Sequence, residues 1–466
     1  MGQKIELFET MPVPRALLQM AIPTIIGQLI TMIYNLADTF FIGQTDNPYM
    51  VAAASVAFVL FFIQNALSNL FGVGGGSLIS RLLGQKRPKE AKRVYAFSMY
   101  GTVAITILYS VICFIFMEPL LRLLGASDNT ILYCCQYTLW VTVIGGLPTC
   151  LSMVMGHMLR SEGYAKQASF GFGLGGVINI ILDPIFMFVI LEPGNEVTGA
   201  AVATMLSNCI SFLYFGVICY RLRHNTSFCI SPKKAIPDRK SIISVFSVGL
   251  PSAIGSLLSC FANTVVNNLT SGYNDFALAA MGIVKKIDML PMNVGMGLCQ
   301  AMVPLVAYNY STKNYERMNS FANVAKIAGM SFAGICIIVF ETFAPQIIRL
   351  FIGNAKTVAY GTDFLRIAVL ATPLMIFNFL MSYTFQAMGK GSKSLLLTSC
   401  RQGLVNIPML FMMNAAFGLY GVIWTQLVSD GITIILSVVL YNRLMKDLKD
   451  TNTVYEPKKQ RTLSLK

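Results

Sequence analysis

The chain has 466 residues, of which 55% are hydrophobic and only 12% are charged, and its mean hydropathy is +0.63. This composition excludes a chain of two or three soluble domains and is typical of a membrane protein. The net charge of +14 does not indicate a nucleic-acid-binding protein, because the basic residues lie in the links between apolar segments.

Twelve apolar runs follow one another along the chain. Each has about 20 residues or more, the length that a helix needs to cross the hydrocarbon core. The runs cover residues 17–42, 51–80, 94–117, 131–155, 168–191, 197–220, 242–270, 277–307, 321–345, 357–387, 394–417 and 419–442. The first run is too long for the apolar region of a signal peptide, so no signal peptide is expected. The predicted fold class is an all-α integral membrane protein with twelve transmembrane helices.

Positive charge falls on alternate links between the runs. The link SRLLGQKRPKEAKR after the second run and the link RLRHNTSFCISPKKAIPDRK after the sixth hold six Lys or Arg each, and the tail beyond Tyr441 holds seven. The links QTDNPYM, LEPGNEV and SGYND hold none, although Arg349 and Lys356 lie on the same side as these links. Because basic links stay in the cytoplasm, both termini are predicted to be cytoplasmic.

The second half of the chain repeats the first. AIPTIIGQLITMIYNLADTFFIG aligns with GLPSAIGSLLSCFANTVVNNLTS at an offset of 228 residues, and GGVINI, which contains Asn179, resembles QGLVNI, which contains Asn406. Each half has six runs, an even number, so both halves have the same orientation and are related by a pseudo-two-fold axis along the membrane normal. We predict two six-helix lobes, a cytoplasmic basic linker between them and a cytoplasmic tail, at residues 1–220, 241–442, 221–240 and 443–466 respectively.

Acidic residues inside the apolar runs distinguish the two halves. Asp38, in the stretch NLADTF, aligns with Val266, and Asp183 lies four residues after Asn179, on the same helix face. Pro184 cannot complete its backbone hydrogen bond and is expected to bend the helix beside this carboxylate. A carboxylate at the centre of a membrane helix costs about 2.5 to 3.5 kcal/mol, so the two acids need a function. We expect such acids in the first half only.

Other polar residues lie at the depth of these acids. At about 1.5 Å per residue, the outer half of the first six runs contains Asp38, Tyr137, Asn179, Asp183 and Thr204. Such oxygens suit Na⁺, for which the candidate ligands are Asp38, Asn179, Asp183 and Thr204. Two neighbouring acids also favour a bound proton, and the sequence leaves both ions open. Taken singly, Asp38 could cap a neighbouring helix, and Asn179 and Thr204 could simply join helices.

Seven segments, in order along the chain from about Pro14 to Asn442, together resemble the bacterial branch of the multidrug and toxin extrusion (MATE) family. They are IPTIIGQLITMIYNLADTFFIG, LFGVGGGSLISRLLGQKRPKEA, NIILDPIF, GAAVATMLSN, GLCQAMVPLVAYNY, FQAMGKG and FGLYGVIW. The resemblance implies a twelve-helix transporter of the bacterial cytoplasmic (inner) membrane, with its lobes in a V, that exports cationic amphipathic drugs in exchange for H⁺ or Na⁺. It places the coupling site at the same five residues.

One branch of this family carries further acids on its seventh and tenth helices. Here the seventh run between Gly249 and Ser271 and the tenth between Ala368 and Met388 contain no Asp or Glu. Coupling through a second-lobe acid of that kind is therefore in doubt, and we assign the coupling site to the first lobe.

The eighth run contains its own charges, in GIVKKIDMLP. Lys285 and Asp288 are three residues apart and can pair on one helix face, whereas Lys286 points elsewhere. The family resemblance puts a basic residue at this place. Lys286, Asp288 and Asn35 are therefore candidates for the substrate cavity between the lobes.

The resulting hypothesis is an antiporter in which the two lobes rock against each other. A cationic drug and the coupling ion, H⁺ or Na⁺, would compete for Asp38 and Asp183, and no other cofactor is expected. The alternative is an exporter or flippase of a lipid-linked saccharide or polymer. An enzyme is not expected, because His157 and His224 are the only histidines and neither can assemble a catalytic centre within a run. We expect a monomer in the lipid bilayer that binds no nucleic acid.

Overall fold

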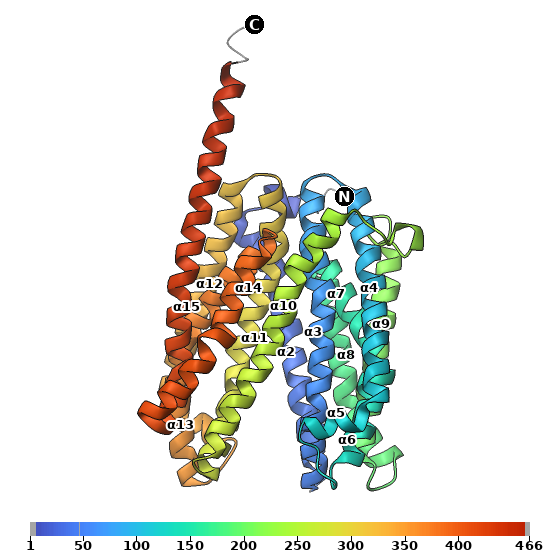
Figure 1. The fold of residues 1–466 in the computed structure, drawn as a ribbon, viewed down its shortest axis with the longest axis vertical. Helices are drawn as coiled ribbons and strands as arrows, with labels where there is room; N and C mark the ends of the chain where they lie inside the picture. The colour runs from blue at the N-terminus through green and yellow to red at the C-terminus, as the bar shows by residue number, and fades with distance from the viewer. Residues whose placement is uncertain (1–5, 46, 462–466) are drawn as a thin grey trace.

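The computed structural model describes residues 6–45 and 47–461, and within this part of the chain every regular element is a helix (Figure 1). The long helices are α2 (Val13–Gly43), α3 (Pro48–Gly84), α4 (Pro88–Ile115), α7 (Gly146–Ser161), α8 (Ala165–Ile185), α9 (Glu196–Arg221), α10 (Arg239–Ser271), α11 (Asp275–Ser311), α12 (Tyr315–Arg349), α13 (Ala355–Ala387) and α15 (Asn406–Arg461). Short helices complete the fold: η1 (Glu6–Thr10), α5 (Met117–Leu123), α6 (Ile131–Thr138), η2 (Leu139–Ile144), η3 (Phe186–Ile190), η4 (Pro232–Lys234), α14 (Gly391–Ser399) and η5 (Cys400–Leu404).

The predicted number of spans agrees with this structure. In the described residues, ten helices are long and apolar enough to cross a membrane, and the pair Ile131–Ile144 and Gly146–Ser161, bent by 50°, forms an eleventh span. One of the ten, Gly391–Leu448, is 58 residues long and is broken at Gly418, so it contains two spans. The chain is therefore a multi-pass membrane protein, with twelve spans among the described residues. The spans lie where they were predicted, but α15 continues to Arg461, well past the predicted end at residue 442.

Gly418 has a backbone conformation that other residues avoid. Its φ of 59° and ψ of −142° lie in a region that is almost restricted to Gly. We expect Gly418→Ala to lower the midpoint of thermal unfolding in detergent, at a cost of about 1–3 kcal/mol. Gly334→Ala on α12 is the matched control, since an added Cβ would meet nothing within 4 Å and Ala is the better helix former. An equal response of the two variants would show that the break does not depend on Gly.

Asparagine side chains set the starts of several spans. The side-chain oxygens of Asn47, Asn274, Asn314 and Asn354 each accept a backbone N–H from the first turn of the following helix. Such a cap satisfies one of the four N–H groups that have no partner within the helix. Short polar links with an Asn before an apolar run therefore fix where α3, α11, α12 and α13 begin.

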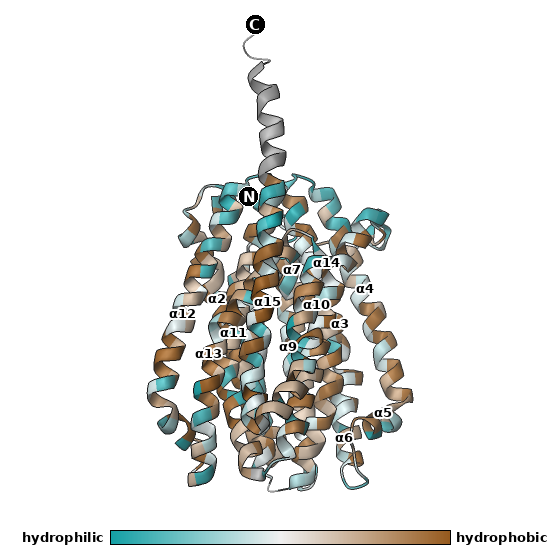
Figure 2. Ribbon diagram, turned by 60° about the vertical axis from the view of Figure 1, so that its left-hand side comes forward, coloured by the Kyte–Doolittle hydropathy of each residue, from teal (hydrophilic) through white to brown (hydrophobic). Residues whose placement is uncertain are grey.

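The outer surface of the bundle is apolar over its middle and polar at its ends (Figure 2). On α4, the side chains of Ile107 and Phe114 are 50% and 60% exposed, and on α12 those of Ile335 and Ile338 are 60% and 68% exposed. Apolar side chains exposed in this way would be unfavourable in water. They form the surface that faces lipid.

Two lobes make up the bundle, as Figure 1 shows: α2 to α9 form the first lobe and α10 to α15 the second. The basic links 85–87 and 222–238 lie at the end of the bundle where α2 begins, and this end is called the basic face below. The chain passes between the lobes in the link 222–238. The exact domain limits given above stay a prediction.

The lobes are joined toward the basic face. There α3 crosses α10 so closely that a Cβ at Gly249 would collide with the carbonyl oxygen of Leu70, and one at Gly74 would collide with that of Val245. The GVGGGS segment, which contains Gly74, therefore serves helix packing, as small residues do in membrane bundles.

Side-chain hydrogen bonds also join the lobes at mid-bundle or toward the basic face. Gln300 on α11 accepts from Gln28 at 2.9 Å and from Arg160 at 2.6 Å, and Ser77 donates to the carbonyl oxygen of Gln386 at 2.7 Å. Across the part of the chain that the structure describes, the recorded side-chain hydrogen bonds between lobes lie at mid-bundle or toward the basic face. The lobes are thus closed at this face.

Candidate functional site

Helix α8 supplies the two central residues of the site. Asn179 and Asp183 are fully buried, and Nδ2 of Asn179 donates to Oδ1 of Asp183 at 3.1 Å, which confirms the predicted shared face. After Pro184 the span continues as the π-helix η3 (Phe186–Ile190). Ala165–Ile190 remains one span, and the helix type changes after Pro184. The bend expected at Pro184 stays a prediction. The wider turns of a π-helix are frequent at functional sites.

Helix α9 contributes Thr204, which faces Asn179. The same Nδ2 of Asn179 donates to Oγ1 of Thr204 at 3.2 Å, and Ser207 follows one turn later with its hydroxyl bonded to the carbonyl oxygen of Thr204 at 2.9 Å. The predicted grouping of Asn179, Asp183 and Thr204 is therefore correct in geometry. One amide group holds a carboxylate on its own helix and a hydroxyl on the next.

The remaining two predicted residues approach from other helices. Asp38 on α2 is half-buried, and its charge interacts with that of Asp183. Tyr137 on α6 is buried and lies within electrostatic range of both carboxylates. Asn35, a candidate for the substrate cavity, donates instead to the carbonyl oxygen of Thr31 on its own helix at 2.8 Å. Four helices thus bring all five predicted coupling residues into one region of the first lobe.

Three buried oxygens in this region lack a hydrogen-bond donor among the described residues: Oδ1 of Asp38, Oδ1 of Asn179 and Oδ2 of Asp183. Buried polar atoms are almost always paired in folded proteins, and an unpaired buried acceptor costs about 1–3 kcal/mol or more. Oxygens of this kind suit a positively charged or proton-donating partner. The site can therefore accept a proton or a small cation.

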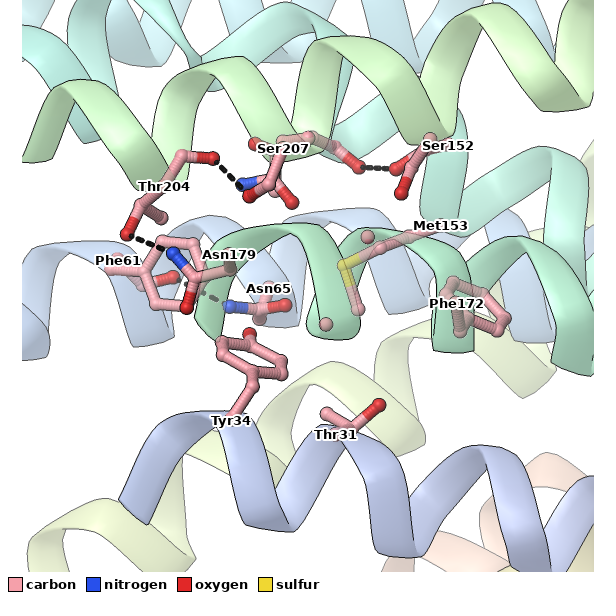
Figure 3. Close-up of a pocket in the computed structure, with 15 residues that line it drawn as sticks. Thr31, Tyr34, Phe61, Asn65, Ser152, Met153, Phe172, Asn179, Thr204 and Ser207 are labelled. Atoms are coloured by element: carbon pink, nitrogen blue, oxygen red, sulfur yellow. Dashed lines mark hydrogen bonds between the residues drawn. The ribbon is translucent and has the colours of Figure 1, made fainter. Parts of the chain in front are cut away.

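A small cavity adjoins Asn179 (Figure 3). Its volume is about 90 Å³, and it is lined from several helices, with Tyr34 from α2, Asn65 from α3, Asn179 from α8 and Asn208 from α9. Figure 3 shows the Asn179 amide between Thr204 and Tyr34. Drug-sized ligands need cavities of about 300–1,000 Å³. This cavity is large enough for an ion or a few water molecules, but not for a drug.

The donor set fits a monovalent ion better than a transition metal. Within the described ranges there is no group of three or more His, Cys, Asp or Glu that could hold a metal ion. Two carboxylates with amide and hydroxyl oxygens from Asn179 and Thr204 are hard ligands, which suit Na⁺ or a proton rather than a soft metal. The choice between these two ions stays a prediction.

The charges of the eighth span lie apart from this site. Lys285 donates to Oδ1 of Asn267 on α10 at 2.8 Å, and no ion pair joins it to Asp288 in the described part of the chain. Lys286 is exposed, and Asp288 is half-buried near Arg401 and Asp430. The role of Lys286 and Asp288 in a substrate cavity stays a prediction.

Several functional candidates were missed by sequence reasoning. Tyr34 lies one turn before Asp38, and that i, i+4 spacing could have indicated it. In the second lobe, Arg401 and Asp430 form a buried ion pair at 2.7 Å. The expectation that buried acids occur only in the first half is therefore wrong. The signal was present, since Asp430 is an acid inside the twelfth apolar run.

A two-lobed bundle whose described residues form twelve spans, with an ion-sized cavity inside one lobe, is the architecture of a membrane transporter. The chain belongs to the MatE family, whose model matches residues 23–185 and again residues 251–412. The two matches place one copy of the family's unit in each lobe and confirm both the repeat and the resemblance to the MATE family. The members of this family are transporters, and no family of enzymes is indicated.

Relatives and solved structures agree along almost the whole chain. Multidrug export protein MepA of Staphylococcus aureus (strain MRSA252) is 31% identical over 451 residues, which are 97% of this chain and 98% of the relative. A crystal structure of MATE in complex with MaL6 has a TM-score of 0.90 at 25% identity, over 96% of this chain and 99% of that one. An outward-facing conformation of a multidrug resistance MATE family transporter of the MOP superfamily has a TM-score of 0.86, also at 25% identity and with the same coverage.

Proposed function

We propose that the protein is a multidrug efflux antiporter, which exports cationic amphipathic compounds in exchange for H⁺ or Na⁺. The observation that carries the proposal is the set of three buried oxygens without donors, on Asp38, Asn179 and Asp183. Two acids beside unpaired acceptors form a site that is stable when a cation or proton occupies it. The names of the relatives, which include a multidrug export protein, support the drug as the second cargo.

Exchange follows if the coupling ion and the drug cannot share this negative charge. The cavity beside Asn179 is large enough only for an ion. The drug would therefore bind outside this cavity, where the negative charge of Asp38 and Asp183 attracts it. In a medium of low dielectric constant such a field is weakly screened. An ion or proton on the carboxylates removes the attraction for the drug, and a bound drug cation lowers the affinity for the ion.

The closed seam between α3 and α10 supports alternating access. Because the lobes touch toward the basic face, the opposite side is the one that can open in this conformation. In this proposal the basic face and both termini lie on the cytoplasmic side of a bacterial inner membrane, which the distribution of Lys and Arg supports. Release of the drug outside and uptake of the coupling ion there would then precede rocking of the lobes and opening at the basic face.

Purified protein in proteoliposomes tests the proposal. We expect an imposed gradient of either Na⁺ or protons to drive ethidium in the direction opposite to the movement of the ion. The movement of ethidium should stop when that gradient is collapsed. The gradient that drives transport identifies the coupling ion. Empty liposomes are the control. If ethidium movement ignores both gradients while lipid-linked saccharide is translocated, the alternative of a saccharide exporter replaces this one.

A further inference from the structure

The internal repeat extends to the ion site itself. GGVINI (175–180) on α8 aligns with QGLVNI (402–407), and GAAVATMLSN (199–208) on α9 aligns with GVIWTQLVSD (421–430) on α15. This alignment pairs Asn179 with Asn406 and Thr204 with Gln426. In the first lobe Asn179 donates to Thr204 at 3.2 Å, and in the second lobe Asn406 donates to Oε1 of Gln426 at 3.2 Å. The same contact between the same pair of spans is therefore present in both lobes.

The second copy lacks the two acids of the first, since Asp183 aligns with Leu410 and Asp38 with Val266, and it carries two charges of its own. Asp430 aligns with Asn208, which lines the cavity of the first lobe, and Arg401 aligns with Leu174. Nε of Arg401 donates to Oδ1 of Asp430 at 2.7 Å, and the two side chains are 7% and 0% exposed. The second lobe thus has a guanidinium group at the position where the first lobe has the apolar Leu174.

The carboxylate of Asp430 has donors on both oxygens. Gln426 donates to Oδ2 at 2.8 Å, and Asn378 on α13 donates to Oδ1 at 3.3 Å and to the carbonyl oxygen of Asp430 at 3.0 Å. The guanidinium of Arg401 also lies over the ring of Phe379, with its carbon 4.4 Å from the ring centroid. Arg401 is therefore held in place by a charge, a hydrogen bond and an aromatic face.

The two lobes differ in whether their buried side-chain oxygens have hydrogen-bond donors. In the first lobe, oxygens of Asp38, Asn179 and Asp183 lack donors among the described residues. In the second lobe, both oxygens of the buried acid are bonded, and a positive charge is part of the chain. In the second lobe, the guanidinium of Arg401 supplies the positive charge beside the buried acid. In the first lobe, no side chain of the described residues does so, and a cation from solution can take that place.

We propose that Arg401 is a tethered cation that fills the second-lobe copy of the ion site, so that a mobile cation exchanges only in the first lobe. This inference rests on the proposed function for the first-lobe site. Its consequence is that removing Arg401 converts Asp430 into a binding site for a small monovalent cation of the alkali or guanidinium class. Asp288 on α11, whose charge interacts with both Arg401 and Asp430, adds negative charge to that site.

The test uses Arg401→Ala in an Asp183→Asn background, which removes the first-lobe site from the measurement. The midpoint of thermal unfolding in detergent is followed against methylguanidinium and against Na⁺, at constant ionic strength with choline, at neutral and at mildly alkaline pH. We expect a saturable rise in the midpoint, because a ligand that binds the folded state stabilises it. Asp183→Asn alone, with Arg401 in place, should show no such rise.

Two further variants separate this inference from a structural role. Arg401→Met/Asp430→Leu should fold and lose the response, since replacing both members of a buried pair by apolar residues of similar volume is often tolerated. Arg401→Gln keeps a donor for Asp430 without the charge, and it takes the place of Arg401→Ala if that variant does not fold. A folded Arg401 variant that ignores both ions at both pH values would overturn the proposal.

Failure of the proposed function is a separate outcome. It would appear as gradient-driven ethidium transport by Asp183→Asn at the wild-type rate. The present inference depends instead on the difference between the variants with and without Asp430.

Discussion

Asp183→Asn is expected to abolish transport driven by the coupling-ion gradient while the protein remains folded in the membrane. Asn has the shape of Asp but no charge, and its side-chain oxygen can still accept from Nδ2 of Asn179, as Oδ1 of Asp183 does at 3.1 Å. The charge that attracts a cation is lost, along with an unpaired acceptor of the site. An interaction with a charged group contributes about 1.5–3 kcal/mol, so the affinity for the coupling ion should fall about tenfold to a hundredfold.

The measurement is the initial rate of ethidium efflux from proteoliposomes with equal amounts of wild type and variant. The control is Asp128→Asn, which removes a charge that is 89% exposed and paired with Arg122 at 2.8 Å, and it should transport like the wild type. Efflux by Asp183→Asn at the wild-type rate would show that Asp183 is structural. In that case the three unpaired oxygens would need another explanation, and the proposed coupling site would be wrong.

Local spacing was sufficient to predict much of the first-lobe site. The four-residue separation of Asn179 and Asp183 placed them on one face, and a count of depth along the helices brought Thr204 to the same level. Both contacts are present in the structure. Such predictions succeed in a membrane protein because helices are straight enough over a few turns for depth to be read from residue number.

Contacts between distant helices could not be predicted in this way. Spacing on α11 suggested that Lys285 pairs with Asp288, but the amide of Asn267 on α10 is the partner. Arg401 and Asp430 are 29 residues apart, on spans whose relative rotation depends on packing. Periodicity within one helix contains no information on that rotation, so the pair could have been suspected only from the presence of two opposite charges in apolar runs.

The closure between the lobes depends on Gly249, and Gly249→Ala is expected to reduce transport strongly. A Cβ at this position would collide with the carbonyl oxygen of Leu70 on α3. The obstacle is backbone, so no change of side-chain rotamer can relieve it, and α10 must move away from α3. Overpacking of this kind costs about 1–3 kcal/mol. The cost falls on the conformation in which the lobes touch, so the population of that conformation should fall by about 5- to 150-fold relative to one that is open at the basic face.

Hydrogen–deuterium exchange gives a direct measure of this shift. In Gly249→Ala, exchange should increase in the facing segments of α3 and α10, around Leu70 and Val245, whereas the core of the first lobe around Asn179 should be unaffected. Gly282→Ala is the matched control, because an added Cβ at this position on α11 meets nothing within 4 Å. The proposed antiport cycle passes through both conformations, so a shift toward either one should slow transport even though the ion site is intact. If Gly249→Ala has normal hydrogen–deuterium exchange rates and normal transport, the contact between α3 and α10 does not control which side of the protein is open.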